Sequence, residues 1–524
     1  MLLRATIILA GAVVLILEIV GARLLSPFFG STQYVWSALI AVTLLSLSVG
    51  YAAGGRLADQ LEPLATSPPL RGREPRAALY QALVLAGWLI LLMPWSRRLI
   101  LPASAALGVR AGSLAAAFAL LAPPLILLGT ISPLAAKTAV TGLGTLGSGV
   151  GSLYALSTLG SLAGALATGF LLIPLLGVVR ILDCSAALLF FPALLYWGSA
   201  AKGSGRRLWI VVAAAGLVVA GVGMARRDRG PLGSKTDHWE LLEHADSRYG
   251  DVRVVQYGGT RRVLLLDGTM QTGVDISNHT PLFYYAAALP ALALAAHPPG
   301  KRALLIGFGG GVVADLLTTR GFAVESVEID PVVEAAARRY FVVHRELPVA
   351  REDGRTFLCH AVPGAYDLVI LDAYAGDTPP SHLFTTEAYG LVRRALAPGG
   401  VGLANMIAVA QGPEGRAARS VGRTLRTVFP WVEAYAVDPG DGVTNVLFLF
   451  GDRVRTITRL PKIDALPEIT AYLRGLLHRR VSLEDPGAQV FTDDYNPVES
   501  MNLRARERMR DNLHSLLPAW LLLE

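Results

Sequence analysis

A glycine-rich turn followed by an acid is the feature of this sequence with the clearest chemical potential. Gly307, Gly309 and Gly311 directly follow an apolar run, and Glu328 closes a second apolar run further along the chain. Glycines let the backbone approach a ligand closely, and a carboxylate about twenty residues on can accept both hydroxyls of a ribose. We therefore expect a nucleoside-binding site on a strand–turn–helix–strand unit.

Further acids follow the strands that we expect beyond this unit. Asp353 and Gly354 come after the next predicted crossover, and the buried-type run 366–371 ends in Asp372. Ligands of an open parallel sheet bind outside the carboxyl ends of its strands. A glycine-rich turn alone is also compatible with an ordinary tight connection, so the convergence of these acids with Glu328 is what favours a pocket.

Strand-like and helix-like segments alternate over 301–450, which predicts a mostly parallel, doubly wound α/β sheet of Rossmann-like type. Two late runs, 432–437 and 445–450, flank a Pro/Gly/Asp turn and predict an antiparallel closing pair. Ahead of the sheet, the runs 251–257 and 262–267 flank a Gly-Gly pair. They predict a β-hairpin in a small N-terminal β subdomain.

The first 225 residues are far more apolar than the rest of this 524-residue chain. Apolar runs close to the ~20 residues that cross a bilayer recur along them, whereas a cleaved leader has only one such run. We expect a multi-pass α-helical membrane domain of about seven spans. The expected spans are Thr6–Leu24, Val35–Ala53, Leu79–Trp95, Ser113–Ile131, Gly149–Leu172, Val178–Trp197 and Leu208–Met224.

The chain as a whole divides into five expected segments. A polar stretch with Gly, Pro and Ser separates the membrane domain from the remainder, and a Thr-Asp-Asp-Tyr-Asn-Pro-Val-Glu motif lies near the C-terminus. The expected segments are 1–225 transmembrane, 226–237 linker, 238–290 β subdomain, 291–455 Rossmann-like nucleoside-binding domain, and 456–524 C-terminal helical segment.

Glu18 stands out inside the first expected span. A carboxylate in an apolar span is costly and is a candidate functional residue by default. A structural pairing with Arg23, near the end of the span, explains it as well as a transport role does.

The charge and the cysteine content indicate whether lipid, nucleic acid or metal is an expected partner. The net charge of +7 is explained by juxtamembrane basic residues facing anionic lipid, and no interleaved basic and aromatic pattern indicates nucleic acid. Cys184 and Cys359 offer neither a disulfide framework nor metal-ligand spacing, so we expect no metal. Lys and Arg are spread almost evenly over alternate connections and do not orient the spans.

Residues 239 to about 450 resemble the spermidine synthase (polyamine aminopropyltransferase) family, which has a class I S-adenosylmethionine-dependent transferase fold. With the N-terminal spans, the whole resembles the bacterial membrane-fused spermidine synthase group. Methyltransferases compete, but they commonly carry an acid where this chain has Leu305. The matching motifs are Trp239-Glu240, 247–252, Leu266-Asp-Gly-Thr-Met-Gln271, the glycine turn, Glu328-Ile-Asp330, Asp353-Gly354, and Asp372 to Phe384.

The resemblance implies that the nucleoside half of the site is retained, with decarboxylated S-adenosylmethionine or S-adenosylmethionine as co-substrate. Each nucleoside-binding role of the family falls on a matching residue of this chain. Glu328 and Asp330 correspond to the ribose-binding motif, Asp353 and Gly354 to the adenine edge, Gly307, Gly309 and Gly310 to the backbone approach, and Gln271 and Asp372 to the floor of the site.

The amine half departs from the family. The family has an aspartate in the glycine loop for the aminopropyl ammonium, and a second that deprotonates the attacking amine; this chain has Gly310 and Ala375. A glutamine beside the first-strand tyrosine is replaced by Gly250. The Tyr-Gln pair before the helix leading into the sheet corresponds to Leu282 and Phe283.

Other acids could restore this chemistry, because an attacking amine needs a base and an ammonium needs a carboxylate. Asp377 or Asp372 is the expected base. Asp493 or Asp494 is the expected partner of the distal ammonium. Asp377 before Thr-Pro-Pro would also suit a turn, and Asp493 would also suit a helix cap.

Three functions stay open on these residues. The first is aminopropyl transfer from decarboxylated S-adenosylmethionine to an amine, with release of methylthioadenosine. The second uses S-adenosylmethionine for alkyl or methyl transfer, elimination or cyclisation. The third is a non-catalytic membrane protein that senses a nucleoside or polyamine. Glu18 favours it, and so does the segment Gly-Gly-Arg-Leu-Ala-Asp at 54–59, which resembles part of a loop motif of major facilitator transporters.

Metabolism suggests the location, because these sulfonium donors are cytosolic. We expect a multi-pass protein of the inner membrane with a cytoplasmic C-terminal domain. Seven spans then place the N-terminus outside. From the resemblance, we expect a homodimer through the soluble part.

Overall fold

The computed structural model describes residues 1–61, 75–139, 146–199, 205–225, 239–342, 344, 346–438 and 442–523. The chain divides into two compact units. Unit 1 comprises Met1–Arg229 with Ala519–Glu524, and unit 2 comprises Gly230–Pro518. The expected linker, 226–237, lies outside the described residues.

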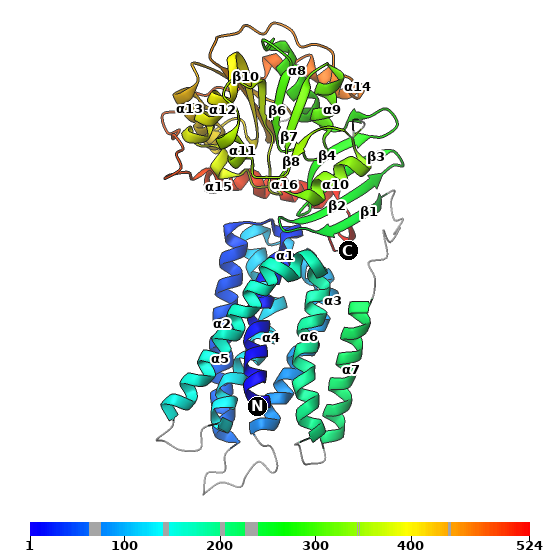
Figure 1. Cartoon of the computed structure of the whole chain (residues 1–524), viewed down its shortest axis with the longest axis vertical. Coiled ribbons are helices and arrows are strands. Elements are labelled where there is room, and N and C mark those ends of the chain that lie inside the picture. Colours follow the sequence, from blue (N-terminus) through cyan, green and yellow to red (C-terminus); the bar gives the residue numbers. More distant parts are fainter. Residues whose placement is uncertain are drawn as a thin grey trace. The chain divides into compact units, whose positions relative to one another are not determined.

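Unit 1 is a bundle of helices (Figure 1). Within its described residues, seven helices are long and apolar enough to cross a membrane, and each expected span falls within one of them. A π-helical segment separates the fifth and sixth helices, and Gly177 (φ 73°) interrupts the sixth. The helices are α1 Leu2–Phe29, α2 Gln33–Gln60, α3 Pro75–Ala105, α4 Gly108–Ala139, α5 Leu146–Ala167, η2 Thr168–Leu172, α6 Ile173–Ser199 and α7 Arg206–Ala225.

Small residues let α1 and α5 approach closely. A Cβ atom on Gly160 would lie 2.0 Å from the carbonyl oxygen of Ile8, so this contact requires glycine. The Ser161 hydroxyl donates to the Gly11 carbonyl oxygen at 2.9 Å. Such close backbone contacts are typical of helix pairs in membranes. Glu18 lies half-buried on α1.

The main sheet of unit 2 has seven strands in the order β11-β12-β10-β9-β6-β7-β8. Its middle strands are parallel, and β11 and β12 close one edge as an antiparallel pair. The prediction of a parallel sheet with an antiparallel closing pair is therefore confirmed. The strands are β6 Arg302–Ile306, β7 Ala323–Val327, β8 Val349–Ala350, β9 Tyr366–Leu371, β10 Leu396–Val409, β11 Trp431–Ala436 and β12 Val443–Gly451.

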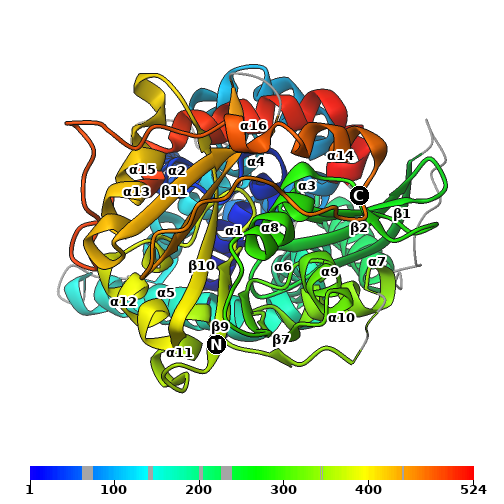
Figure 2. The same cartoon turned by 90° about the horizontal axis from the view of Figure 1, so that it is seen from above.

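Both faces of this sheet are covered by helices (Figure 2). Alternate strand residues point to opposite faces, so Leu305 and Ile370 lie in the core beneath α8 and α9, whereas Leu304 and Leu371 lie in the core beneath α11, α12 and α13. The helices are α8 Tyr284–Ala295, α9 Val312–Thr319, α10 Pro331–Tyr340, α11 Gly354–His360, α12 Thr386–Ala395, α13 Arg416–Val428 and α14 Pro467–Leu473.

A second, antiparallel sheet precedes the main one and has five strands in sequence order. The expected hairpin is its β2–β3 pair, in which Tyr257 faces Arg261 across the turn. Val254 and Leu264 of this sheet share a core with Val333 of α10. The strands are β1 Trp239–Asp246, β2 Asp251–Tyr257, β3 Arg261–Leu266, β4 Thr269–Asp275 and β5 Thr280–Pro281.

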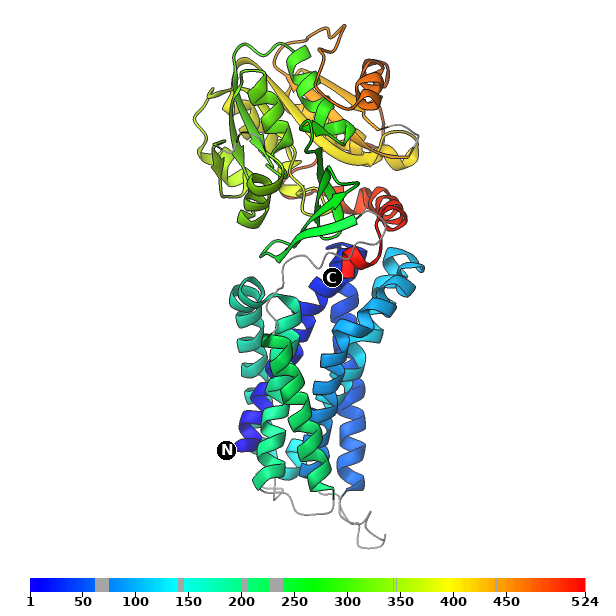
Figure 3. The same ribbon diagram turned by 90° about the vertical axis from the view of Figure 1, so that its right-hand side faces the viewer.

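The C-terminal segment of unit 2 ends in helix α16, Leu503–Leu516, preceded by α15, Val498–Met501. In Figure 3 this red helix lies beside the green five-stranded sheet, and it contacts β4, β10 and β12. Helix α16 thus reaches both sheets of unit 2. The short helices of this unit are η3 Ser381–Leu383, η4 Pro413–Gly415 and η5 Leu476–His478.

Candidate active site

A cavity of about 310 Å³ lies where the strand order of the main sheet reverses. The chain proceeds outward from β6 to β7 and β8, then returns to place β9 on the other side of β6. Ligands of open α/β sheets bind at such a switch point. Gly307 follows β6 and Asp372 follows β9, and both line the cavity together with residues of β4, α8, β10, β12 and α16.

The glycine turn has a conformation that requires glycine. Gly307 has φ 93°, and a Cβ atom there would lie 2.4 Å from the carbonyl oxygen of Asp372. The Gly307 N–H donates to the Val327 carbonyl oxygen at 2.9 Å. The turn therefore brings bare backbone to the edge of the cavity, where Gly309 also lies.

Glu328 lies buried at the end of β7, behind the glycine turn. Its carboxylate accepts the N–H groups of Phe308 and Gly309 at 3.2 Å each and that of Asp330 at 3.0 Å. Burial raises the pKa of Glu328 to about 7, although these backbone hydrogen bonds oppose the rise. Asp330 caps α10 through the Val332 N–H and accepts the Ser247 hydroxyl, so Asp330 joins the main sheet to the β1–β2 turn.

Asp353 follows β8, the strand paired with β7, and caps α11. It accepts the Thr356 N–H at 2.9 Å and lies 2.9 Å from His382 Nε2. Burial would raise the pKa of Asp353, but these two hydrogen bonds hold it below its ordinary value. A Cβ atom on Gly354 would lie 2.3 Å from Ile306. Asp353 and Glu328 thus close adjacent strand ends, outside the cavity lining.

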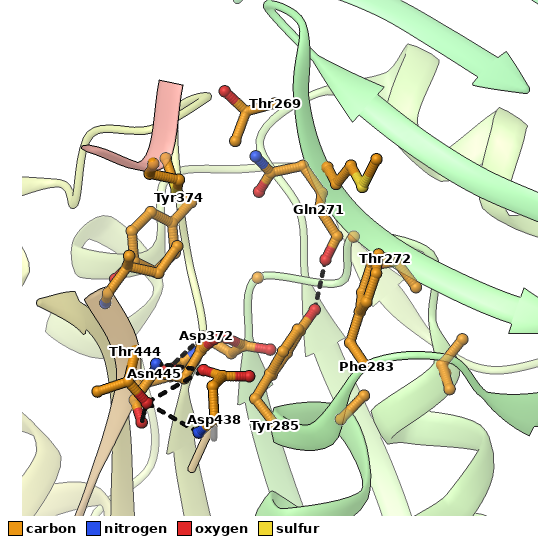
Figure 4. A pocket seen from close by; sticks show the side chains of 18 of the residues that line it. Thr269, Gln271, Thr272, Phe283, Tyr285, Asp372, Tyr374, Asp438, Thr444 and Asn445 are labelled. Carbon is orange, nitrogen blue, oxygen red and sulfur yellow. Dashed lines mark hydrogen bonds between the residues drawn. The ribbon is translucent and has the colours of Figure 1, made fainter. Parts of the chain in front are cut away.

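Two half-buried carboxylates of the cavity, Asp372 and Asp438, are joined by a chain of amides (Figure 4). Asn405 Nδ2 donates to Asp372 at 2.7 Å, and Asn445 Nδ2 donates to Asn405 Oδ1 at 2.9 Å. The Asn445 N–H donates to Asp438 at 2.7 Å. Asp438 lies just beyond β11 and was not among the residues that the sequence singled out.

Burial raises the pKa values of three side chains in this part of the cavity. It raises the pKa of Asp372 to about 7, with the Asn405 hydrogen bond opposing it. It also raises the pKa of Asp438 against the hydrogen bonds from Asn445 and Thr444. Burial and the nearby Asp372 raise the pKa of Tyr285, so this tyrosine keeps its proton and donates it to the Gln271 carbonyl oxygen.

Asp377, a predicted base, lies outside the cavity lining. It is 2% exposed and receives Nη2 of Arg506 and Nε of Arg510, each at 2.9 Å. Burial would raise the pKa of Asp377, but the two guanidinium groups lower it below its ordinary value. Because both of its oxygens are engaged by fixed cations, this geometry argues against Asp377 as the base and for a structural role.

The predicted acceptor acids also lie away from the cavity. Asp493 forms an exposed ion pair with Arg355 and accepts the Thr385 hydroxyl at 2.8 Å. The hydrogen bond from Arg355 lowers the pKa of Asp493. Asp494 is exposed. Neither residue lines the cavity.

Thr272 fills the space that a side chain at position 310 would need. A Cβ atom there would lie 2.6 Å from Thr272 Cγ2, and the Gly310 N–H donates to Thr272 Oγ1 at 3.1 Å. Gln271, on the same strand, donates to the Gly376 carbonyl oxygen at 2.6 Å. Strand β4 therefore fills the space in which the family resemblance led us to expect an aspartate.

Several residues that line the cavity were not predicted from the sequence. Asp438 follows the run 432–437, so the strand-end argument applied to Glu328 and Asp372 would have found it. Tyr374, which accepts the Ile407 N–H, lies two residues beyond Asp372. The sequence predicted a helical segment at the C-terminus, where α16 lies, but not that this helix lines the cavity.

Three side chains elsewhere in unit 2 lie close together, but one of them is already bound by a cationic residue. Among the described residues, His244, Asp246 and Asp251 are close enough to share an ion. However, Asp251 binds Arg253 at 2.6 Å and His244 at 2.7 Å. Asp251 of this group is therefore engaged by Arg253 and His244.

Comparison with known proteins relates the chain to one family. The family model described as "Spermine/spermidine synthase domain" matches residues 282–437. A "Polyamine aminopropyltransferase" of Moorella thermoacetica is 31% identical over 37% of this chain and 69% of its own length. A "Probable polyamine aminopropyl transferase" of Bifidobacterium longum is 29% identical over 43% of this chain, which spans only 54% of that relative.

The similarity extends beyond unit 2 in another relative. A "Polyamine aminopropyltransferase" of Mycobacterium tuberculosis is 28% identical over 68% of this chain and 68% of its own length. That share is larger than unit 2, so the match continues into the apolar helices. The solved structure of a probable spermidine synthase from Corynebacterium glutamicum gives a TM-score of 0.40 at 19% identity, over 48% of this chain and 96% of that one.

Proposed function

This chain belongs to the polyamine aminopropyltransferase (spermidine synthase) family, and we propose that it transfers an aminopropyl group from decarboxylated S-adenosylmethionine to an amine, with release of methylthioadenosine. The observation that carries the proposal is the cavity at the strand switch point. There the glycine turn faces Asp372, a half-buried carboxylate with a pKa raised to about 7.

The nucleoside of the donor would occupy the strand ends of β7 and β8. Glu328 would accept the ribose hydroxyls and Asp353 would face the adenine edge, as the family motifs imply. Gly307 and Gly309 support this placement, because both line the cavity and neither carries a side chain.

Asp372 would act as the base. The acceptor nitrogen attacks the carbon beside the sulfonium in line, so a C–N bond forms while the C–S bond breaks and its electron pair stays on sulfur. The attacking amine gives up a proton, which Asp372 accepts. A pKa near the working pH suits this role, because the carboxylate is then partly ionised and still basic. Positioning in the cavity supplies the remaining rate enhancement.

Asp438 would neutralise an ammonium group in the same cavity. Hydrogen bonds through Asn445 and Asn405 connect it to Asp372. Two carboxylates therefore match the two nitrogens of the reaction, the aminopropyl ammonium of the donor and the attacking amine.

The location follows from the donor. We place the seven apolar helices in the inner membrane and unit 2 in the cytoplasm, where the sulfonium donors are made. Seven spans then put Met1 on the opposite face of the bilayer from unit 2.

A second candidate is a reaction of S-adenosylmethionine itself. It is favoured by Gly310, where Thr272 occupies the space of an ammonium-binding aspartate. The purified full-length protein should be incubated with either donor and a panel of amines, and the products identified by mass spectrometry. Methylthioadenosine with an aminopropylated amine supports the first function. S-adenosylhomocysteine supports the second, and no product from either donor overturns both.

A further inference from the structure

Helix α16 forms a wall of the cavity and lies beyond residue 437, where the family match ends. Met509, Leu513 and Leu516 line the cavity and are spaced i, i+4 and i+7, so they share one face of the helix. Leu513 is 7% exposed, whereas Leu516 is 63% exposed and lies toward solvent. Asn512 supplies the single amide of this wall.

The helix is held in place by buried polar contacts. Arg506 and Arg510 are 4% and 1% exposed, and both bind Asp377 of the segment that follows β9. Arg510 Nη1 also donates to the Asp267 carbonyl oxygen at 2.8 Å in the β3–β4 turn. Asn502 Nδ2 donates to the Ile407 carbonyl oxygen at 2.7 Å. The wall is therefore anchored to both sheets.

Acidic groups are confined to the other part of the cavity. Among the described residues that line it, Asp372 and Asp438 are the carboxylates. Figure 4 shows these two acids together in the lower part of the cavity, with Gln271 and Thr269 above them. Asp377, which contacts α16, is already paired with Arg506 and Arg510 of that helix.

This distribution limits the number of ammonium groups that the cavity can hold. The donor brings one ammonium and the acceptor one reacting amine, and the two carboxylates match these. A second ammonium on the acceptor would lie against Met509 and Leu513 without a counter-charge, and burying an unpaired charge is strongly unfavourable. An apolar chain would instead bury its methylene groups there.

Resting on the proposed function, we propose that α16 selects an acceptor with a single amine on an apolar chain over a diamine. The full-length protein, decarboxylated S-adenosylmethionine and two acceptors of equal length test this: 1-aminopentane and 1,4-diaminobutane, which differ by a methyl in place of an ammonium. We expect kcat/KM for methylthioadenosine release to be at least about tenfold higher with 1-aminopentane.

A carboxylate placed on the wall should change the preference. Leu513→Asp gives the second ammonium a partner, so the preference should shrink or invert. Leu513→Asn has the same shape without the charge and should not improve the diamine. Ser515→Asp is the matched control, because Ser515 is exposed on the same helix and lies outside the cavity lining.

The outcomes separate this inference from the function on which it rests. If the wild-type protein prefers 1,4-diaminobutane, aminopropyl transfer stands and the role of α16 is overturned. If neither amine yields methylthioadenosine, the proposed function fails and the inference fails with it. Should Leu513→Asp not fold, as thermal unfolding would reveal, the wild-type comparison still decides.

Discussion

Asp372 is the residue on which the proposed chemistry depends most directly. Asp372→Asn preserves the oxygen that accepts Asn405 Nδ2 but cannot take a proton. We expect kcat to fall by about 10²- to 10⁴-fold, the usual contribution of a general base. The rate of the wild-type protein should rise with pH through about 7 as Asp372 ionises, and that rise should be absent in the variant.

The control for this experiment is Asp493→Asn. Asp493 sits in an exposed ion pair outside the cavity, so its substitution should leave kcat within about twofold, as exposed pairs contribute little. An Asp372→Asn protein with the rate and pH profile of the wild type would remove Asp372 from the mechanism.

Glu328 should leave a signature in the pH dependence of stability. Its pKa is raised from 4.5 to about 7 in the folded protein, so between these values the native state binds a proton that the unfolded chain has released. The free energy of unfolding therefore falls as pH rises through this window. Glu328→Gln should lose less stability from pH 5 to pH 8 than the wild type does.

Thermal unfolding of the ligand-free, full-length protein measures this difference. Each kcal/mol corresponds to a shift of about 2–4 °C in Tm for a unit of this size. Parallel Tm profiles for the two proteins would mean that Glu328 is not protonated in the folded state at neutral pH.

At the scale of elements, the docking of α16 depends on one carboxylate opposite two guanidinium groups. Asp377→Asn removes the carboxylate charge that pairs with both buried guanidinium groups, which should destabilise unit 2 by about 3–5 kcal/mol. Limited proteolysis should then cut the segment around α16 faster than in the wild type. Denaturant unfolding of the full-length protein gives the free-energy change.

Arg504→Ala offers a comparison on the same helix. Arg504 pairs with Glu414 at 3.0 Å, but its side chain is 70% exposed, so its loss should change stability by less than about 1 kcal/mol. Equal effects of Asp377→Asn and Arg504→Ala would show that the buried cluster does not hold α16.

At the scale of the whole molecule, the two native cysteines report the orientation in the membrane. Cys359 is exposed on unit 2, and Cys184 lies in α6. With Cys184→Ser, a membrane-impermeant maleimide should label Cys359 only after the cells are permeabilised, because we place unit 2 in the cytoplasm. The reverse pattern would invert the proposed topology.

The opposite end of the chain supplies the complementary measurement. Arg4 is exposed at the start of α1, and seven spans place it outside the cell. A protein carrying Arg4→Cys with Cys184→Ser and Cys359→Ser should be labelled in intact cells. If Arg4→Cys and Cys359 are labelled on the same side, the number of spans is even.

The sequence alone determined the seven apolar helices, the alternation of strands and helices in the main sheet, and the strand-end placement of Glu328, Asp353 and Asp372. These features follow from local periodicity and from glycine chemistry, which a short window of residues contains. The β2–β3 hairpin was predicted in the same way. The β3–β4 pair could have been predicted as well, because the two residues that join it, Asp267-Gly268, are typical of a hairpin turn.

Only the tertiary structure decided which acids share the cavity. Asp377 is bound by Arg506 and Arg510, which lie 129 and 133 residues away along the chain, and no local pattern connects them. Asp438 meets Asp372 through Asn445 and Asn405 because β12 and β10 are neighbours in the sheet. The pKa values of these acids and the side chains that line the cavity depend on such long-range neighbours. Burial and nearby charges are set by residues that come together only in the folded chain.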